Sequence, residues 1–210
     1  KYDANGMLIK VTAPGVKPVV RNYHYEAGDK TLLTGITIGE RRYSTYNYYP
    51  DRRVKVSALA GDEEKDSFEY GDQMTKVTNA NGQETTYWFV DAGGGELKIK
   101  KIDRAGTITC SAASAITYYD AYGYIDYTED WNGNRTDYAF DANGRLKSKT
   151  TAAGTPDAHT EVFSWEDTYL TGTSFHDASG RAYKTLKYVY HQAGAARGKP
   201  AETTMTDHST

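Results

Sequence analysis

The sequence has little of what marks a metalloprotein, a disulfide-stabilised domain or a membrane protein. Cys110 is its single cysteine, so an internal disulfide framework is excluded. The five histidines lack metal-ligand spacing among themselves and to Cys110, so we expect neither a metal site nor a cofactor. No stretch is apolar enough to span a bilayer, and few segments show ten residues of helical periodicity.

Charge and short motifs exclude further classes of function. The formal net charge is −3 with both signs interspersed, so bulk charge predicts binding neither to nucleic acid nor to a membrane surface. The run Gly93-Gly94-Gly95-Glu96 lacks the Lys-Ser/Thr of a phosphate loop, and we interpret it as a hairpin turn. No Gly-x-Ser-x-Gly nucleophile motif is present, and the sequence selects no pair of carboxylates for glycoside hydrolysis. We therefore expect no catalytic residues and no enzyme activity.

Tyrosine is what the sequence has in excess, with 19 residues against 5 phenylalanines. The clearest pattern is the stretch 138–146, Tyr-Ala-Phe-Asp-Ala-Asn-Gly-Arg-Leu. Tyr138 and Phe140 are two residues apart and would share one face of a strand. Asp141 can accept hydrogen bonds from nearby backbone N–H groups, and Gly144 supplies the positive φ that ends a tight turn. The stretch therefore predicts a β-hairpin.

This unit recurs along the whole chain, with close copies at 2–8 and 118–125 and looser copies elsewhere. The second aromatic of each copy falls at positions 2, 25, 48, 70, 89, 119, 140, 165 and 190. A period in the low twenties, sustained nine times, indicates a repeat architecture. At 51–54 the turn glycine is lost. The predicted fold is all-β, an open, twisted array of stacked antiparallel hairpins.

A second type of turn lies between the aromatic anchors, at 79–82 and 130–133, so each period holds two turns and two strands. Consecutive hairpins can then pair edge to edge into one sheet. The long step from 89 to 119 contains residues 112–115, Ala-Ala-Ser-Ala, which we expect to be a surface insertion. Residues 1–192 are predicted to form about nine repeats, and 193–210 a loop or a truncated next repeat. Because the chain starts inside a repeat, we expect it to be a fragment of a longer protein.

The candidate residues fall into three groups. The first two groups are structural, because Asp-x-x-Gly favours turns and aromatic side chains pack across neighbouring strands. The turn residues are Asp3, Gly6, Asp120, Gly123, Asp141 and Gly144, and the structural aromatics are Tyr2, Tyr25, Tyr119, Tyr138 and Phe140. The third group keeps an alternative open, since tryptophans on short hairpins can stack on sugars in carbohydrate or cell-wall binding modules. Its members are Trp88, Trp131 and Trp165.

The motif Tyr-x-Tyr/Phe-Asp-x-x-Gly-Arg-Leu at about twenty-residue spacing resembles the YD or Rhs repeats. These repeats occur in bacterial polymorphic toxins, in the cocoon component of insecticidal toxin complexes and in teneurins. The resemblance runs across essentially the whole chain, is strongest at 118–149, and is degenerate at 43–59 and 163–175. It implies a curved, spiral sheet that forms a hollow shell around a C-terminal toxin, or an adhesion scaffold as in teneurins.

The resemblance also implies partners and a location. The expected partners are flanking repeats of the same parent chain and an enclosed C-terminal toxin domain. Self-association through exposed sheet edges is a further expectation, because unpaired strand edges recruit other strands. The implied location is secreted or on the bacterial cell surface.

Overall fold

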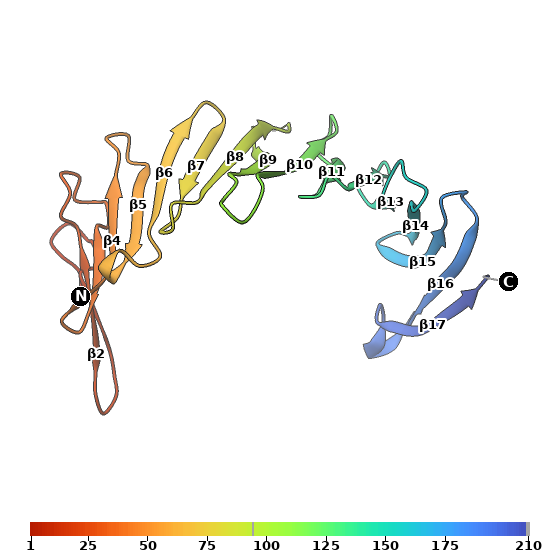
Figure 1. The fold of residues 1–210 in the computed structure, drawn as a ribbon. Coiled ribbons are helices and arrows are strands. Elements are labelled where there is room, and N and C mark those ends of the chain that lie inside the picture. Colours follow the sequence, from red (N-terminus) through yellow and green to blue (C-terminus); the bar gives the residue numbers. More distant parts are fainter. Residues whose placement is uncertain (94, 209–210) are drawn as a thin grey trace. The chain divides into compact units, whose positions relative to one another are not determined.

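The computed structural model describes residues 1–93 and 95–208 and consists almost entirely of antiparallel β-strands (Figure 1). These residues contain 17 strands and two short 3-10 helices, η1 (Ala60–Asp62) and η2 (Gly194–Ala196). The strands are rich in Tyr, Thr, Val and Ile, whose side chains suit a pleated surface. The predicted all-β fold of stacked hairpins in an open sheet is confirmed.

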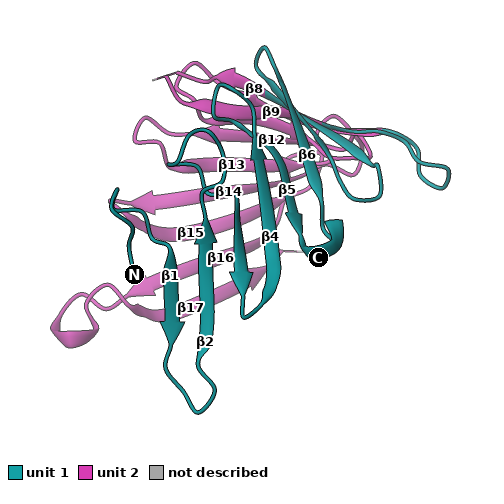
Figure 2. Cartoon of the chain, turned by 90° about the vertical axis from the view of Figure 1, so that its left-hand side faces the viewer, with its two compact units in different colours: residues 1–88, 103–112 teal, residues 89–102, 113–210 magenta. Residues whose placement is uncertain are grey.

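The chain divides into two compact units (Figure 2). Unit 1 comprises residues 1–88 and 103–112, and unit 2 comprises residues 89–102 and 113–210. The first nine strands along the chain are β1 (Lys10–Ala13), β2 (Val19–His24), β3 (Gly35–Ile38), β4 (Arg41–Tyr48), β5 (Val54–Leu59), β6 (Asp66–Gly71), β7 (Met74–Thr78), β8 (Glu84–Asp91) and β9 (Leu97–Arg104). The later strands are β10 (Ala113–Tyr119), β11 (Ile125–Glu129), β12 (Arg135–Phe140), β13 (Leu146–Thr151), β14 (His159–Glu166), β15 (Tyr169–His176), β16 (Ala182–Tyr190) and β17 (Pro200–Asp207).

Strand pairing follows the order of the chain within each unit. In unit 1 every strand from β1 to β8 pairs antiparallel with the next strand. In unit 2 the same holds from β10 to β17. Such a meander needs only short connections, and this explains why the turns dominate the sequence pattern.

A β-bulge marks the second aromatic of five hairpins. The strand register shifts by one residue at Tyr48, Tyr119, Phe140, Trp165 and Tyr190. A bulge places two residues opposite one on the partner strand and changes the direction of a side chain. The aromatic side chain therefore leaves the regular alternation of its strand at the same place in each repeat.

The sheet has almost no conventional core. Ala58 is the one buried hydrophobic residue among those the structure describes, with 4% of its surface exposed. The accessible surface is 14306 Å², whereas a compact protein of 23.3 kDa would expose about 9,700 Å². An excess of this size agrees with the scarcity of buried hydrophobic side chains among the described residues.

The predictions for residues 112–115 and for the glycine run at 93–95 have different outcomes. The surface insertion expected at 112–115 is wrong, because Ala113 to Ala115 begin strand β10. The irregular segment lies just before it, where Thr107 and Cys110 form a tight backbone turn with an N–O distance of 2.7 Å. Gly94, the centre of the predicted glycine turn, is outside the described residues, but Gly93 and Gly95 on either side have φ of 98° and 79°.

Residues 200–207 of the predicted tail form β17, which pairs with β16 along its length. No helix in the described part of the chain has the length and hydrophobicity needed to cross a membrane.

Candidate functional site

One carboxylate caps each of the Asp-x-x-Gly turns that follow an aromatic pair. At the tip of the β12–β13 hairpin, the Asp141 N–H donates to the Arg145 carbonyl, and the Gly144 N–H donates to the Asp141 carbonyl, both at 2.9 Å. Asp141 Oδ1 accepts the N–H groups of Asn143 at 2.9 Å and Arg145 at 3.0 Å. Gly144 has φ of 75°, which glycine adopts without steric cost. One aspartate therefore satisfies two backbone donors that the turn would otherwise expose.

The other predicted turns repeat this geometry. Asp3 Oδ1 accepts two backbone N–H groups at 2.9 and 2.8 Å, and Asp120 Oδ1 accepts two at 2.9 Å. Gly6 and Gly123 have φ of 79° and 80°. The turns that precede the aromatic pairs use the same arrangement, with Asn79, Asp130 and Asp177 as the leading residue.

Hydrogen bonding lowers the pKa of several turn carboxyls. The side chain of Arg145 has the largest effect on the pKa of Asp141, and the N–H groups that the carboxylate accepts lower it further. The pKa of Asp130 is lowered chiefly by the Asn134 side chain, and that of Asp177 by the Ser179 hydroxyl. These groups favour the charged carboxylate and make the turns sensitive to acid.

The second aromatic of a repeat donates a hydrogen bond to the preceding repeat. The acceptor is a backbone carbonyl 15 to 20 residues earlier, on an apolar residue at or near the start of a returning strand. The pairs are Tyr25 with Leu8 (3.0 Å), Tyr48 with Leu33 (2.6 Å), Tyr70 with Val54 (2.8 Å), Tyr119 with Ile99 (2.9 Å), Trp165 with Leu146 (2.8 Å) and Tyr190 with Leu170 (2.9 Å). We call this series the aromatic ladder.

The sequence analysis missed the aromatic ladder, because it considered the aromatics for packing or for sugar stacking and not as hydrogen-bond donors between repeats. A signal was present, because five of the six donors are tyrosines and each follows its apolar acceptor residue by 15 to 20 residues. Phe140 has no donor and instead stacks on Tyr124, with ring centroids 4.9 Å apart. Tyr2 is 65% exposed, and the half-buried Tyr138 lies opposite Lys149 in the sheet.

The three tryptophans proposed for sugar stacking lie in different elements of the fold. Trp88 lies in β8, Trp131 in the turn before β12, and Trp165 in β14, and each is half-buried. The Trp88 indole donates to Asp103 Oδ2 at 2.8 Å, and the Trp165 indole belongs to the aromatic ladder. Sugar stacking by these three residues stays a prediction.

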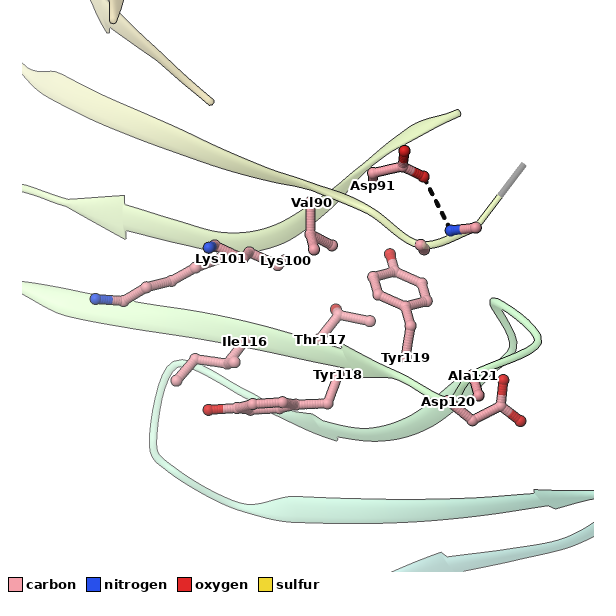
Figure 3. A pocket seen from close by; sticks show the side chains of 12 residues that line it. Val90, Asp91, Lys100, Lys101, Ile116, Thr117, Tyr118, Tyr119, Asp120 and Ala121 are labelled. Carbon is pink, nitrogen blue, oxygen red and sulfur yellow. Dashed lines mark hydrogen bonds between the residues drawn. The ribbon is translucent and has the colours of Figure 1, made fainter. Parts of the chain in front are cut away.

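A hollow of about 650 Å³ opens within unit 2, between β9 and the end of β10 (Figure 3). It is lined by aromatic, aliphatic and charged side chains. They include Val90, Asp91, Lys100, Lys101, Ile116, Thr117, Tyr118, Tyr119 and Asp120. No cluster of three or more His, Cys, Asp or Glu side chains suited to a metal ion occurs in the described residues.

Comparison with known proteins gives only distant similarities. No protein-family model and no curated protein matches the chain. Similar solved structures include a crystal structure of TcdB2-TccC3 without the hypervariable C-terminal region, at 14% identity and a TM-score of 0.41. Two further structures, TcdB2-TccC3-TEV and TcdB2-TccC3, are 12% identical with TM-scores of 0.28. Each match covers 90% of this chain but 10% to 15% of the other, so the chain spans a small part of these proteins.

Proposed function

We propose that this chain is a structural segment of the shell of a Rhs/YD-repeat protein. In this proposal it has no catalytic role and helps to enclose or present a C-terminal toxin domain. Its partners are the flanking repeats of its parent chain and the enclosed domain. The protein acts outside the cell or on the surface of a bacterium.

The observation that carries the proposal is the aromatic ladder. Each rung joins one repeat to the repeat immediately before it, so the contacts are local along the chain and do not build a central core. Stability in such an array comes from each repeat and from its interfaces with neighbours. A wall has this organisation, whereas a compact enzyme needs layers packed around one core.

The exposed faces support the same interpretation. Strands with one buried hydrophobic residue among those described cannot exclude water on their own. One face of the sheet can become an inner surface if further repeats continue the sheet around a cargo. The Asp-capped turns at the ends of the hairpins satisfy the backbone where the wall meets solvent.

The size of one unit indicates that flanking repeats are needed. The eight paired strands β10 to β17 extend about 34 Å across, at about 4.8 Å per strand. A cargo of about 100 residues is a ball of roughly 17 Å radius, with a circumference of about 107 Å. One unit covers about a third of that circumference, so we propose that neighbouring repeats of the parent chain complete the enclosure.

The test uses the longest reading frame that contains this sequence. The parent protein is expressed whole and treated with a protease, with and without residues 113–192 deleted. We expect the C-terminal domain to resist digestion in the whole protein and to be cut rapidly in the deletion variant. A whole protein whose C-terminal domain is digested as fast as the isolated domain would refute enclosure.

The control for this experiment is a variant that changes one turn residue while keeping the number of repeats. Gln73→Ala changes an exposed turn residue in unit 1 and should leave protection unchanged. If that control loses protection as completely as the deletion, protection reflects general stability and the shell proposal fails.

A further inference from the structure

Tyr118 departs from the repeat pattern at a defined position. In the five bulged hairpins, the residue just before the second aromatic is Asn47, Tyr118, Ala139, Ser164 or Val189. Four of these side chains are small, polar or aliphatic, and Tyr118 alone among the five is aromatic. The aromatic ladder does not need this ring, because Tyr119 makes the rung to Ile99. The aromatic ladder therefore does not explain this extra tyrosine.

The Tyr118 ring is the outer layer of a three-layer stack. It lies nearly parallel to Tyr127 on the paired strand, with ring centroids 4.2 Å apart and 19° between the planes. The guanidinium of Arg135 lies 3.9 Å from the centroid of the Tyr127 ring. Two groups this close to one centroid cannot share a face, so Arg135 and Tyr118 cover opposite faces of Tyr127. Tyr118 remains 45% exposed, which leaves it able to stack on a fourth layer.

This stack borders the hollow of unit 2. The bulge between Tyr118 and Tyr119 interrupts the alternation of side chains, and both tyrosines line the hollow (Figure 3). Val90 and Ile116 add aliphatic surface to the lining. The volume of about 650 Å³ falls within the range of about 300–1,000 Å³ typical of small-molecule sites.

The polar groups of the hollow are balanced in charge. Asp91 and Asp120 supply two carboxylates, and Lys100 and Lys101 supply two ammonium groups. Oδ1 of each aspartate accepts backbone N–H groups in its own turn. Among the described residues, Oδ2 of neither aspartate makes a hydrogen bond, so both oxygens can accept hydroxyl groups of a ligand.

We propose that this hollow binds a neutral carbohydrate, with one pyranose ring stacked on Tyr118. A sugar ring has an apolar face for the tyrosine and hydroxyl groups at its edge for carboxylates and ammonium groups. A strongly anionic or cationic ligand is disfavoured, because the two charges of each sign cancel. A cation is further disfavoured because Arg135 already draws on the π-electrons of the stack.

This site is separate from the tryptophans Trp88, Trp131 and Trp165. None of the three lines the hollow. The inference also does not depend on the shell proposal, since a shell segment with or without a sugar site would protect a cargo equally. The outcomes of the two experiments are therefore independent.

Saturation-transfer NMR on the 210-residue chain tests the proposal with two neutral probes, cellotriose and chitotriose. We expect at least one probe to receive saturation from the protein, and its dissociation constant is measured by titration. Tyr118→Ala should weaken binding about ten-fold, because it removes the stacking surface. Lys100→Ala, at an exposed position, should weaken it about three-fold through one lost hydroxyl contact.

The matched control is Tyr43→Ala. Tyr43 is a 49% exposed strand tyrosine in unit 1, far along the chain from the hollow, and its removal should leave binding unchanged. An independent readout is the wild-type ring resonances, because Tyr118 should shift on titration while Tyr43 should not. This readout decides the question if Tyr118→Ala does not fold.

Four results would overturn the inference. They are no saturation transfer to either probe, unchanged affinity in the folded Tyr118→Ala variant, an equal loss in Tyr43→Ala, and preferential binding of choline or citrate over both sugars.

Discussion

The β4–β5 hairpin of unit 1 and the β12–β13 hairpin of unit 2 make the same turn from different residues. In the first, the Tyr49 N–H donates to the Arg53 carbonyl and the Arg52 N–H to the Tyr49 carbonyl, both at 2.9 Å. The corresponding bonds in the second hairpin join Asp141, Gly144 and Arg145 at the same distance. The sequence suggested that the turn glycine is lost at 51–54, but the turn itself is retained. Arg52 takes the place of glycine with φ of 72°.

The two hairpins also share an arginine bridge. Asp51 and Arg53 form an ion pair of 2.6 Å, and Asp141 and Arg145 form one of 2.7 Å. Each arginine then lies over the second aromatic of the next repeat, at 4.4 Å from the Tyr70 centroid for Arg53 and 6.0 Å from that of Trp165 for Arg145. The comparison teaches that the register of the repeat and the arginine bridge maintain the turn. The leading aspartate and the glycine lower the free energy of the turn, but other residues can replace them.

The largest effect should come from filling the space at Gly144. A Cβ atom there would collide with the Tyr124 hydroxyl group, in addition to the strain of a positive φ. We expect Gly144→Val to lower the free energy of unfolding by about 3 kcal/mol. The control is Gly133→Val, which has the same φ strain but open space around Cβ, and should cost about 1–2 kcal/mol. Equal losses in urea titrations would contradict the steric part of this explanation.

The next effect concerns the aromatic ladder in the β4–β5 hairpin. Tyr48→Phe removes the 2.6 Å bond to the Leu33 carbonyl and should lower the free energy of unfolding by about 1 kcal/mol. Tyr43, in the same strand, has an exposed ring whose hydroxyl makes no hydrogen bond within the described part of the chain, so Tyr43→Phe should have no effect. A thermal melt in which both variants match the parent protein would show that the ladder does not contribute to stability.

Alkaline pH should have a related effect. Burial raises the pKa of Tyr48 above its ordinary value of 10.0, with a smaller contribution from Tyr46. The stabilising hydroxyl is therefore fully present below pH 10, and its contribution is lost as the pH rises through the folded-state pKa. Melts between pH 8 and 11 should show a smaller alkaline decline for Tyr48→Phe than for the parent protein.

A smaller difference should separate the two carboxylates. Asp141→Ala removes an acceptor for two backbone N–H groups, whereas Asp51→Ala removes an acceptor for one. We expect both variants to lower Tm by a few degrees, with the larger decrease for Asp141. An equal or reversed order would show that the arginine bridge, rather than backbone capping, is the dominant contribution.

Acid should reduce the effect of Asp141→Ala on Tm. Hydrogen bonds from the arginine side chains lower the pKa of both carboxyls below the ordinary value of 3.8. Their contribution is therefore complete above pH 3.8 and is lost as the pH falls through the folded-state pKa values. The Tm difference between the parent protein and Asp141→Ala should shrink on acidification from pH 6 to pH 3. A constant difference would contradict the assignment.

The smallest effect should be a gain at a turn without glycine. Gln73 is exposed and has φ of 49°, a conformation that costs most residues energy. Gln73→Gly should raise the free energy of unfolding by about 0.5 kcal/mol, after allowance for the greater freedom of glycine in the unfolded chain. A loss of stability in chemical denaturation would show that the Gln73 side chain has a role the turn does not explain.

The repeat period and the turns could be predicted from the sequence because both depend on local chemistry. Asp141 and Gly144 are three residues apart, and their preferences act within one turn. The retained turn at Arg52 could not be predicted, because the surrounding register overrides the preference of a single residue for negative φ. The acceptor of each ladder donor lies in another repeat, and the Tyr118 stack depends on a strand register that the pattern of residue types does not reveal.

The aromatic ladder has a consequence for how such a chain can change over evolutionary time. A donor such as Tyr190 reaches only to Leu170, one repeat away, and nothing in that bond refers to repeats farther along. A duplication or deletion of one whole period would therefore leave every remaining rung with a donor and an acceptor. Chain length becomes a variable that selection can adjust in steps of about twenty residues without redesigning what is already there.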